Sequence, residues 1–258
     1  MEQHDLMYML HEVFSPSLPR LGPGDDFSTS KALDMALPVL SCVRDPAQLA
    51  VLDIGCGVGA QTLELARNID GTIAALDNHQ PYLDELMRRA AEKGVADKIT
   101  PLLGDMNDIG MERESLDLIW AEGSLFVMGF VKALAACYAL LKPGGVLAAS
   151  EMVWFEPDPP QECRAFMEME YPALTGLDAN LAVIEESGFE VTGHFSLPES
   201  SWLETYYRPI EERLPVLLER HAADPQMIEF ISLVQMEIDT YRQYSTWYGY
   251  EFFIMRRT

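Results

Sequence analysis

Short apolar runs alternate with longer stretches of helical periodicity along the first 150 residues. Five of these runs are rich in Val, Ile, Leu and Ala and have the length of strands: residues 50–54, 72–76, 99–103, 116–121 and 146–150. We expect helices to fill the intervals between them. Because strands that alternate with helices form parallel sheets covered on both faces, the pattern predicts an α/β fold.

The pattern after residue 150 predicts the closing part of the sheet. Residues 180–187 have a helical pattern that stops at Gly188, residues 189–197 resemble a strand, and residues 250–255 supply a last strand. The interval between these two strands, residues 198–249, is far longer than a normal connection. We therefore expect an insertion there.

The insertion at residues 198–249 has two segments of helical periodicity, residues 210–221 and 225–244. Asp224 and Pro225 lie between them, where Asp caps and Pro opens the second helix. We predict a helical cap over an active site. A homodimer interface is the alternative role for the same helices.

The run Val51-Leu52-Asp53-Ile54-Gly55-Cys56-Gly57-Val58-Gly59 places a hydrophobic strand directly before a glycine turn. Glycines let the backbone bend sharply and approach a ligand, while the first amides of the next helix face its polar groups. Two cofactors fit this arrangement. One is S-adenosylmethionine, and the other is a dinucleotide, because Gly55-x-Gly57-x-x-Ala60 followed by Asp77 also meets the looser Rossmann pattern.

Asp53-x-Gly55-x-Gly57-x-Gly59 resembles the first signature of the class I S-adenosylmethionine-dependent methyltransferases. The run of residues 140–147, with a predicted turn at Pro143-Gly144-Gly145, is also similar to that family. The resemblance is strong from about residue 51 to residue 151 and extends loosely to ubiquinone/menaquinone-biosynthesis and sarcosine/dimethylglycine methyltransferases. It implies a Rossmann-like seven-stranded sheet with helices on both faces, an antiparallel last strand, and a helical cap inserted before that strand.

The resemblance also implies which residues bind S-adenosylmethionine and its product, S-adenosylhomocysteine. In the family the glycine turn holds the methionine end, and the position of Asp105 meets the adenine amino group, with Met106 beside the ring. Asp77, at the end of the second strand, can accept both ribose hydroxyls. Capping of the following helices is the alternative role of these two acids. The predicted set is Asp53, Gly55, Cys56, Gly57, Gly59, Gln61, Thr62, Asp77, Asn78, Gly104, Asp105, Met106, Glu122 and Gly123.

Two acids at strand ends are candidates for catalysis. Methyl transfer from a sulfonium is an in-line displacement, and an oxygen or nitrogen acceptor can require a base. Glu122 and Glu151 follow the fourth and fifth predicted strands. We expect Glu122, with Ser124, to contact cofactor or acceptor, and Glu151, with Trp154, to line the acceptor pocket. The alternatives are that Glu122 caps a helix and Glu151 is solvated.

Aromatic residues gather in and after the insertion: Trp202, Tyr206, Tyr207, Trp247, Tyr248 and Tyr250. They fit a stacking wall for a flat acceptor, a cage for a cationic amine, or the core of the cap. For the acceptor pocket we predict Trp154, Trp202, Tyr206 and Tyr248. The expected function is methylation of oxygen, nitrogen or carbon on a small molecule. The alternatives are a nicotinamide oxidoreductase, an enzyme that uses the same cofactor for other chemistry, and a non-catalytic cofactor-binding protein.

The length of 258 residues suits a single α/β domain with an elaborate insertion. The first 49 residues precede the strands of that domain, and a turn-rich stretch at residues 21–26 separates two expected helices. In similar methyltransferases such a segment folds over the cofactor, so we predict a helical lid. A plain loop is the alternative.

Charge narrows the choice of partners. The 41 acidic and 18 basic residues give a formal charge of −23, which repels a nucleic-acid backbone. Two basic pairs, Arg88-Arg89 and Arg256-Arg257, are expected on solvated faces. The sequence has no signal-peptide pattern, no membrane-length apolar run, and no Cys or His spacing that suggests a metal. We therefore expect a soluble cytoplasmic protein with no membrane partner, reduced thiols and no metal.

Overall fold

The structure is a computed structural model that describes residues 3–42 and 49–258. A single sheet runs through it in the order β3-β2-β1-β4-β5-β8-β7, and the two-residue β6 pairs with β5. Strands are parallel except β8, which is antiparallel to both neighbours. The strands are β1 (Leu49–Ile54), β2 (Gly71–Asp77), β3 (Ile99–Leu103), β4 (Leu116–Glu122), β5 (Leu141–Trp154), β6 (Thr175–Gly176), β7 (Phe189–Ser196) and β8 (Tyr248–Arg257).

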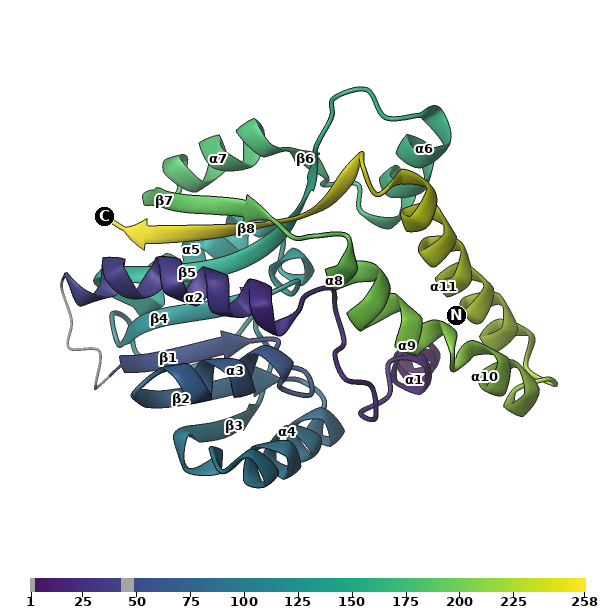
Figure 1. Cartoon of the computed structure of the whole chain (residues 1–258), viewed down its shortest axis with the longest axis horizontal. Helices are drawn as coiled ribbons and strands as arrows, with labels where there is room; N and C mark the ends of the chain where they lie inside the picture. The colour runs from purple at the N-terminus through teal and green to yellow at the C-terminus, as the bar shows by residue number, and fades with distance from the viewer. Residues whose placement is uncertain (1–2, 43–48) are drawn as a thin grey trace.

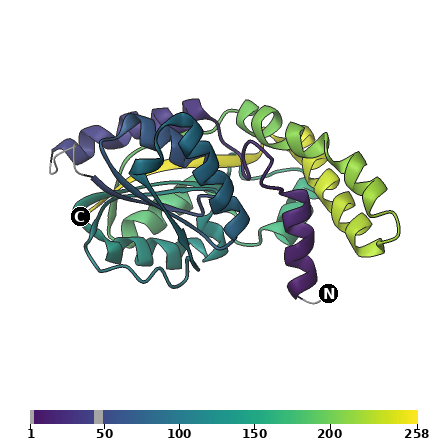
Figure 2. The ribbon, with the colours of Figure 1, turned by 90° about the horizontal axis from the view of Figure 1, so that it is seen from below.

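Helices cover both faces of the sheet (Figures 1 and 2). One apolar core lies between the sheet and α2, α3 and α4, and the other lies between the sheet and α5 and α7. The helices outside the insertion are α1 (Gln3–Val13), α2 (Asp26–Ser41), α3 (Ala60–Asn68), α4 (Gln80–Lys93), α5 (Phe130–Leu140), α6 (Gln161–Glu170) and α7 (Leu177–Glu186), with short turns at Ala96–Lys98 and Leu125–Val127. The predicted α/β fold with an antiparallel last strand is confirmed.

Three details differ from the pattern predicted for the sheet. The interval of residues 104–115, between β3 and β4, contains no helix. The short β6 was not predicted. The turn expected at residues 143–145 lies within the bounds of β5, where the pairing with β4 changes register and Gly144 has a φ of 77°. This irregularity lets β5 continue past the turn, so the strand is longer than its apolar run.

The insertion before β8 is helical, as the sequence predicts. It contains α8 (Ser200–Trp202), a π-helical turn at Leu203–Tyr207, α9 (Arg208–Glu211), α10 (Leu214–Arg220) and α11 (Pro225–Tyr244). The Asp224 carboxylate accepts the amides of Gln226 and Met227 and so caps α11. The buried face of α11 recurs at helical spacing through Met227, Ile231, Val234, Ile238 and Tyr241. Figure 2 shows α1 beside these helices, at one end of the sheet.

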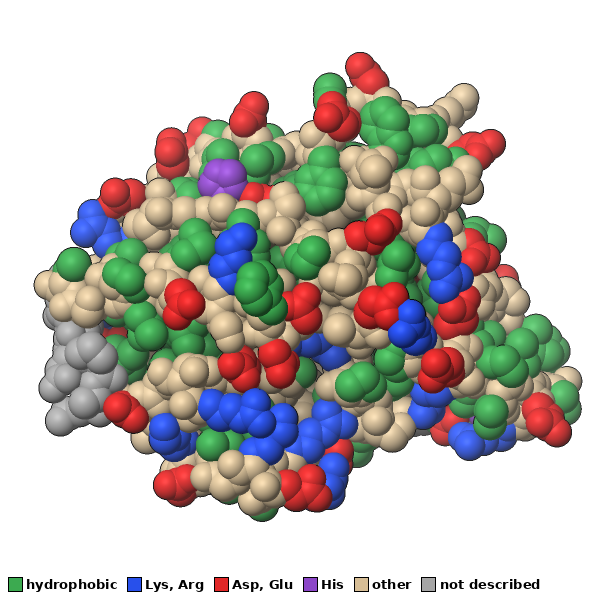
Figure 3. Space-filling model, viewed as in Figure 1, with side chains coloured by type: hydrophobic (Ala, Val, Ile, Leu, Met, Phe, Trp, Pro, Cys, Tyr) green, Lys and Arg blue, Asp and Glu red, His purple; other side chains and the backbone are tan. Residues whose placement is uncertain are grey.

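One member of each basic pair differs from the expectation of solvated faces, while Arg88 and Arg256 are exposed as expected. Figure 3 shows Lys and Arg side chains gathered over α3 and α4. Arg88 is exposed and pairs with Glu85, as expected. Arg89 is largely buried and donates to the carbonyls of residues 16, 18 and 19, so it fastens the N-terminal segment to α4. Arg257 is also mostly buried and donates to the Leu141 carbonyl and to Glu114.

Candidate active site

The glycine turn lies between β1 and α3 and has left-handed backbone geometry. Gly55, Gly57 and Gly59 have φ values of 72°, 52° and 83°. A Cβ atom on Gly55 would lie 2.6 Å from the Ser124 Cβ, so a side chain does not fit there. The amides of Gly55 and Cys56 both donate to the Leu76 carbonyl, at 2.9 and 3.0 Å. These bonds hold the turn against the end of β2.

Asp77, the last residue of β2, is tied to the same turn. Its carboxylate accepts the Gly57 amide on one oxygen and the His79 amide on the other, both at 2.9 Å. Burial nevertheless raises the pKa of Asp77 above its usual range. The carboxylate is therefore positioned by the backbone before any ligand arrives.

A cavity of about 270 Å³ opens above this turn, and we call it the turn cavity. It is lined by the glycine turn, by the ends of β2 and β4, and by residues of α1 and the segment after it. The predicted cofactor residues that line it are Gly55, Cys56, Gly57, Gln61, Asp77, Asn78, Glu122 and Gly123, together with Ser124.

The other predicted cofactor residues lie outside the lining of the turn cavity. Asp53 is fully buried and accepts from Thr62 Oγ1 at 2.5 Å and from Gln61 Nε2 at 3.3 Å. Desolvation raises the pKa of Asp53 to about 7. Asp53 and Thr62 therefore brace the turn from beneath, and Gly59 allows close packing on Leu86.

Three more predicted cofactor residues lie in the segment after β3. Gly104, Asp105 and Met106 do not line the turn cavity. Asp105 is exposed and accepts from the amide and the side chain of Asn107. Asp105 therefore stabilises its own turn; residues 104–115 contain no helix, so it does not cap one, which was the alternative role.

Glu122 is held by three donors and is buried at the base of the turn cavity. It accepts from Arg20 at 2.6 Å, from Thr29 Oγ1 at 2.7 Å and from Trp120 Nε1 at 2.9 Å. The side chains of Arg20 and Glu122 are 7% and 4% exposed. This network fixes the N-terminal segment across the turn cavity, and its geometry suits a positioning role better than proton transfer.

Sequence reasoning missed Arg20 and Thr29, because neither lies in a motif. The segment that carries them is fastened at further points. Ser201 donates to Asp25, and Thr205 Oγ1 donates to the Gly24 carbonyl at 2.6 Å. The N-terminal segment is thus held between the sheet and the helical insertion.

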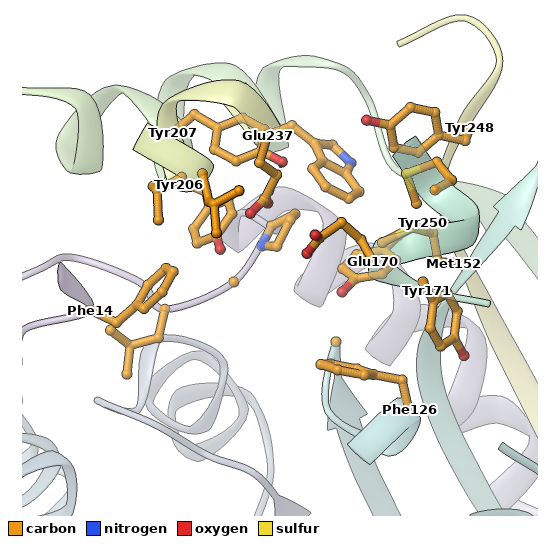
Figure 4. Close-up of a pocket in the computed structure, with 18 of the residues that line it drawn as sticks. Phe14, Phe126, Met152, Glu170, Tyr171, Tyr206, Tyr207, Glu237, Tyr248 and Tyr250 are labelled. Carbon is orange, nitrogen blue, oxygen red and sulfur yellow. Dashed lines mark hydrogen bonds between the residues drawn. The ribbon is translucent and has the colours of Figure 1, made fainter. Parts of the chain in front are cut away.

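A second cavity, of about 440 Å³, lies between the sheet edge and the helical insertion, and we call it the cap cavity. Phe14, Leu21, Gly123 and Phe126 line both cavities, so the two spaces meet at these residues. Figure 4 shows aromatic side chains from both sides directed into the cap cavity. It is lined by, among others, Glu151, Glu170, Trp202, Tyr206, Glu237 and Tyr250.

Three of the four predicted acceptor residues, Trp202, Tyr206 and Tyr248, line the cap cavity. Trp154 does not line it. This side chain forms a T-shaped pair with Tyr248, with ring centroids 6.0 Å apart, and the Arg164 guanidinium lies over its ring. The rings also form a core of their own, since Trp202 stacks on Tyr241 with centroids 4.4 Å apart. The aromatic cluster is therefore both cavity wall and packing.

Glu151 lines the cap cavity and is only 3% exposed, so the alternative of a solvated side chain is wrong. Its Oε1 accepts from Tyr171 Oη at 2.7 Å and from the Met152 amide at 3.1 Å. Desolvation raises the pKa of Glu151 to about 7. A carboxyl with such a pKa can take up and release a proton near neutral pH.

The described parts of the chain narrow the chemistry further. Among residues 6–42 and 49–258, no group of three or more His, Cys, Asp or Glu side chains is arranged to hold a metal ion. The same residues contain no helix with the length and apolar character needed to cross a membrane. All four cysteines are free thiols.

A family model described as a methyltransferase domain matches residues 51–145. The sterol 24-C-methyltransferase erg6 of Aspergillus fumigatus is 22% identical over 209 residues, which cover 78% of this chain and 51% of that relative. The chain thus spans about half the length of this relative. The family match favours the methyltransferase interpretation of the glycine turn over the dinucleotide one.

Solved structures share the fold over nearly the whole chain. A SAM-dependent methyltransferase from Geobacter sulfurreducens, in complex with S-adenosyl-L-homocysteine, superposes with a TM-score of 0.74 at 19% identity and covers 98% of both chains. The [4+2]-cyclase SpnF superposes with a TM-score of 0.73 at 19% identity, and the match covers 99% of this chain and 95% of the SpnF chain. Residues 51–145 thus match a methyltransferase-domain model, and the chain has the fold of the class I S-adenosylmethionine-dependent methyltransferases.

Proposed function

We propose that this protein is an S-adenosylmethionine-dependent methyltransferase that acts on a small molecule held in the cap cavity. The observation that carries the proposal is the meeting of the two cavities at Phe14, Leu21, Gly123 and Phe126. A donor in the turn cavity and an acceptor in the cap cavity would face each other there. Proximity of this kind supplies much of the rate enhancement in a displacement reaction.

The residues of the turn cavity fit such a cofactor. Gly55 and Gly57 expose backbone at positions where a side chain would be strained or would clash. Asp77 presents a fixed carboxylate at the edge where ligands of parallel sheets bind. The cofactor, when bound, supplies a methyl group made electrophilic by the sulfonium.

The chain's own residues would hold the reactants in place, exclude water and accept a proton. Phe14 and Phe126 line the junction and would exclude water from the reacting atoms. Arg20 and Glu122 hold the N-terminal segment over the turn cavity. Glu151 lines the cap cavity as an acceptor for a proton released by an oxygen or nitrogen nucleophile.

Calorimetric titration with S-adenosylmethionine, S-adenosylhomocysteine and NADH tests the proposal. We expect the two sulfur compounds to bind with micromolar dissociation constants and NADH not to bind. Asp77→Asn should weaken their binding about tenfold through the lost acceptor, whereas the exposed Asp97→Asn should leave it unchanged. Preferential binding of NADH, or no binding of either sulfur compound, would refute the proposed function.

A further inference from the structure

The cap cavity is lined by acidic side chains and by no basic ones among its described residues. Three carboxyl groups line it, those of Glu151, Glu170 and Glu237, and none of its described lining residues is Lys, Arg or His. Most of the remaining wall is aromatic or aliphatic. In Figure 4 the carboxylates of Glu170 and Glu237 point toward each other into the cavity. An apolar chamber therefore contains acids with no basic partner in its wall.

Glu151 has an acceptor atom that the protein leaves unused. Its Oε1 takes the donors from Tyr171 and Met152, but Oε2 has no hydrogen-bond partner among the described residues. The side chain is 3% exposed, so bulk water does not satisfy this atom. A buried acceptor without a donor is costly, and an N–H group on a ligand would relieve the cost.

Glu237 is the second carboxyl group whose charged form a bound cation would stabilise. It accepts from Tyr207 Oη at 2.8 Å, and the charge of Glu170 opposes its ionisation. Burial and this repulsion raise the pKa of Glu237 to about 7. No basic side chain faces Glu237 from the lining of the cavity. The ionisable groups nearby are those of Glu170, Tyr206, Tyr207, Tyr248 and Tyr250.

We propose that the methyl acceptor in the cap cavity is an amine that carries a large apolar group. This inference rests on the proposed function and specifies its substrate class. The ammonium form would be drawn in by the carboxylates and by the faces of the surrounding rings. The apolar group would lie against Phe14, Phe166 and Phe230. A phosphate or carboxylate at the same place would be repelled.

Glu151 and the junction residue Gly123 both line the cap cavity. The Gly123 amide, at the junction of the two cavities, donates to Ser150 Oγ at 2.9 Å, and Glu151 is the next residue. After the ammonium gives a proton to a carboxylate, the nitrogen lone pair forms a bond to the methyl carbon. The carbon–sulfur bond breaks and leaves its electron pair on sulfur. The product is a methylated ammonium and a neutral thioether, so charge and atoms balance.

Three probes with one apolar body and different head groups test the inference: 4-phenylbutylamine, 4-phenylbutanol and 4-phenylbutyrate. Each is titrated calorimetrically into the protein, with and without S-adenosylhomocysteine. We expect the amine to bind at least about tenfold more tightly than the alcohol, and the carboxylate not to bind. Glu151→Gln and Glu237→Gln should each weaken amine binding about tenfold and change alcohol binding less than about twofold.

Glu229→Gln is the matched control, because Glu229 lies on the same helix as Glu237 but is exposed and does not line the cavity. It should bind all probes like the parent protein. No amine binding, equal binding of amine and alcohol, or unchanged amine binding in both cavity variants would overturn the inference. Loss of S-adenosylhomocysteine binding alone would refute the proposed function, while the titrations without it would still report the amine preference.

Discussion

The turn cavity and the cap cavity are neighbours built on opposite principles. The turn cavity depends on backbone: glycines at positive φ and amides that donate to Leu76 and Asp77, most of them within one short stretch of chain. The cap cavity depends on side chains from α1, β5, α6, α11 and β8, which are far apart in sequence. The first should therefore tolerate no added atoms, whereas the second should respond to the identity of its side chains.

The carboxyl groups of the two cavities also differ, in how many hydrogen-bond donors the protein gives them. In the turn cavity, Asp77 has two backbone donors and Glu122 has Arg20, Thr29 and Trp120. In the cap cavity, Glu151 has an unused oxygen and Glu237 lies near another acid. The turn cavity is thus preorganised, while the cap cavity has acceptor capacity left for a ligand.

The largest effect is expected from Gly55→Ala. The new Cβ would lie 2.6 Å from the Ser124 Cβ, and Ala is strained at a φ of 72°, so the turn must shift. We expect about a 100-fold loss of S-adenosylhomocysteine affinity by calorimetry. Gly110→Ala is the control, since Gly110 has a φ of 67° and open space around it. If both variants bound the cofactor like the parent protein, the backbone account of the turn cavity would be incorrect.

Arg20→Met should have the next largest effect, on stability. It leaves the buried Glu122 carboxylate with two neutral donors in place of a charge partner. We expect the free energy of unfolding in urea to fall by about 2 kcal/mol, and to recover in part when Glu122→Gln is added. Arg67→Met removes an exposed pair with Glu64 and should cost less than about 0.5 kcal/mol. Equal losses from the two single variants would contradict the role given to the network.

Glu237→Gln should change the dependence of stability on pH. A folded-state pKa of about 7, above the unfolded value near 4.5, means that the folded state holds its proton longer. Stability should therefore fall as pH rises from 4.5 through 7. Removing the carboxyl should reduce this fall by about 1 kcal/mol, measured by urea unfolding at pH 5 and pH 8. Glu229→Gln is expected to follow the parent, and a Glu237→Gln variant that did the same would refute the prediction.

The smallest effect is expected from Tyr171→Phe. Loss of the hydroxyl donor removes a bond that favours the charged form of Glu151, so the pKa of Glu151 should rise further, by about half a unit. Carbon-13 NMR of the Glu151 carboxyl would measure the shift. An unchanged or lower pKa would show that this hydrogen bond does not govern the group.

The parts of the molecule that the sequence predicted are those specified locally. Strands β1 to β4 follow apolar runs, the glycine turn follows its motif, and α11 begins at Asp224 and Pro225 as expected. These features depend on neighbours in the chain, so periodicity and capping suffice to find them. The turn cavity could be placed from the sequence for the same reason.

The rest depends on contacts across large separations. Arg20 meets Glu122 across 102 residues, and the cap cavity joins Glu151 to Glu237. No periodicity marks these pairs, because each side chain only acquires its role when distant elements pack. The same reason explains Trp154, which is the last residue of the longer β5 and packs on Tyr248 outside the cavity lining.

A crystal structure of the protein with S-adenosylhomocysteine would show whether donor and acceptor meet where the two cavities join. We expect the ligand to fill the turn cavity over Gly55 and Gly57, with its sulfur at the junction beside Gly123 and Phe126 and directed into the cap cavity. A sulfur atom turned away from that junction, or a ligand bound outside the turn cavity, would show that methyl transfer into the cap cavity is wrong.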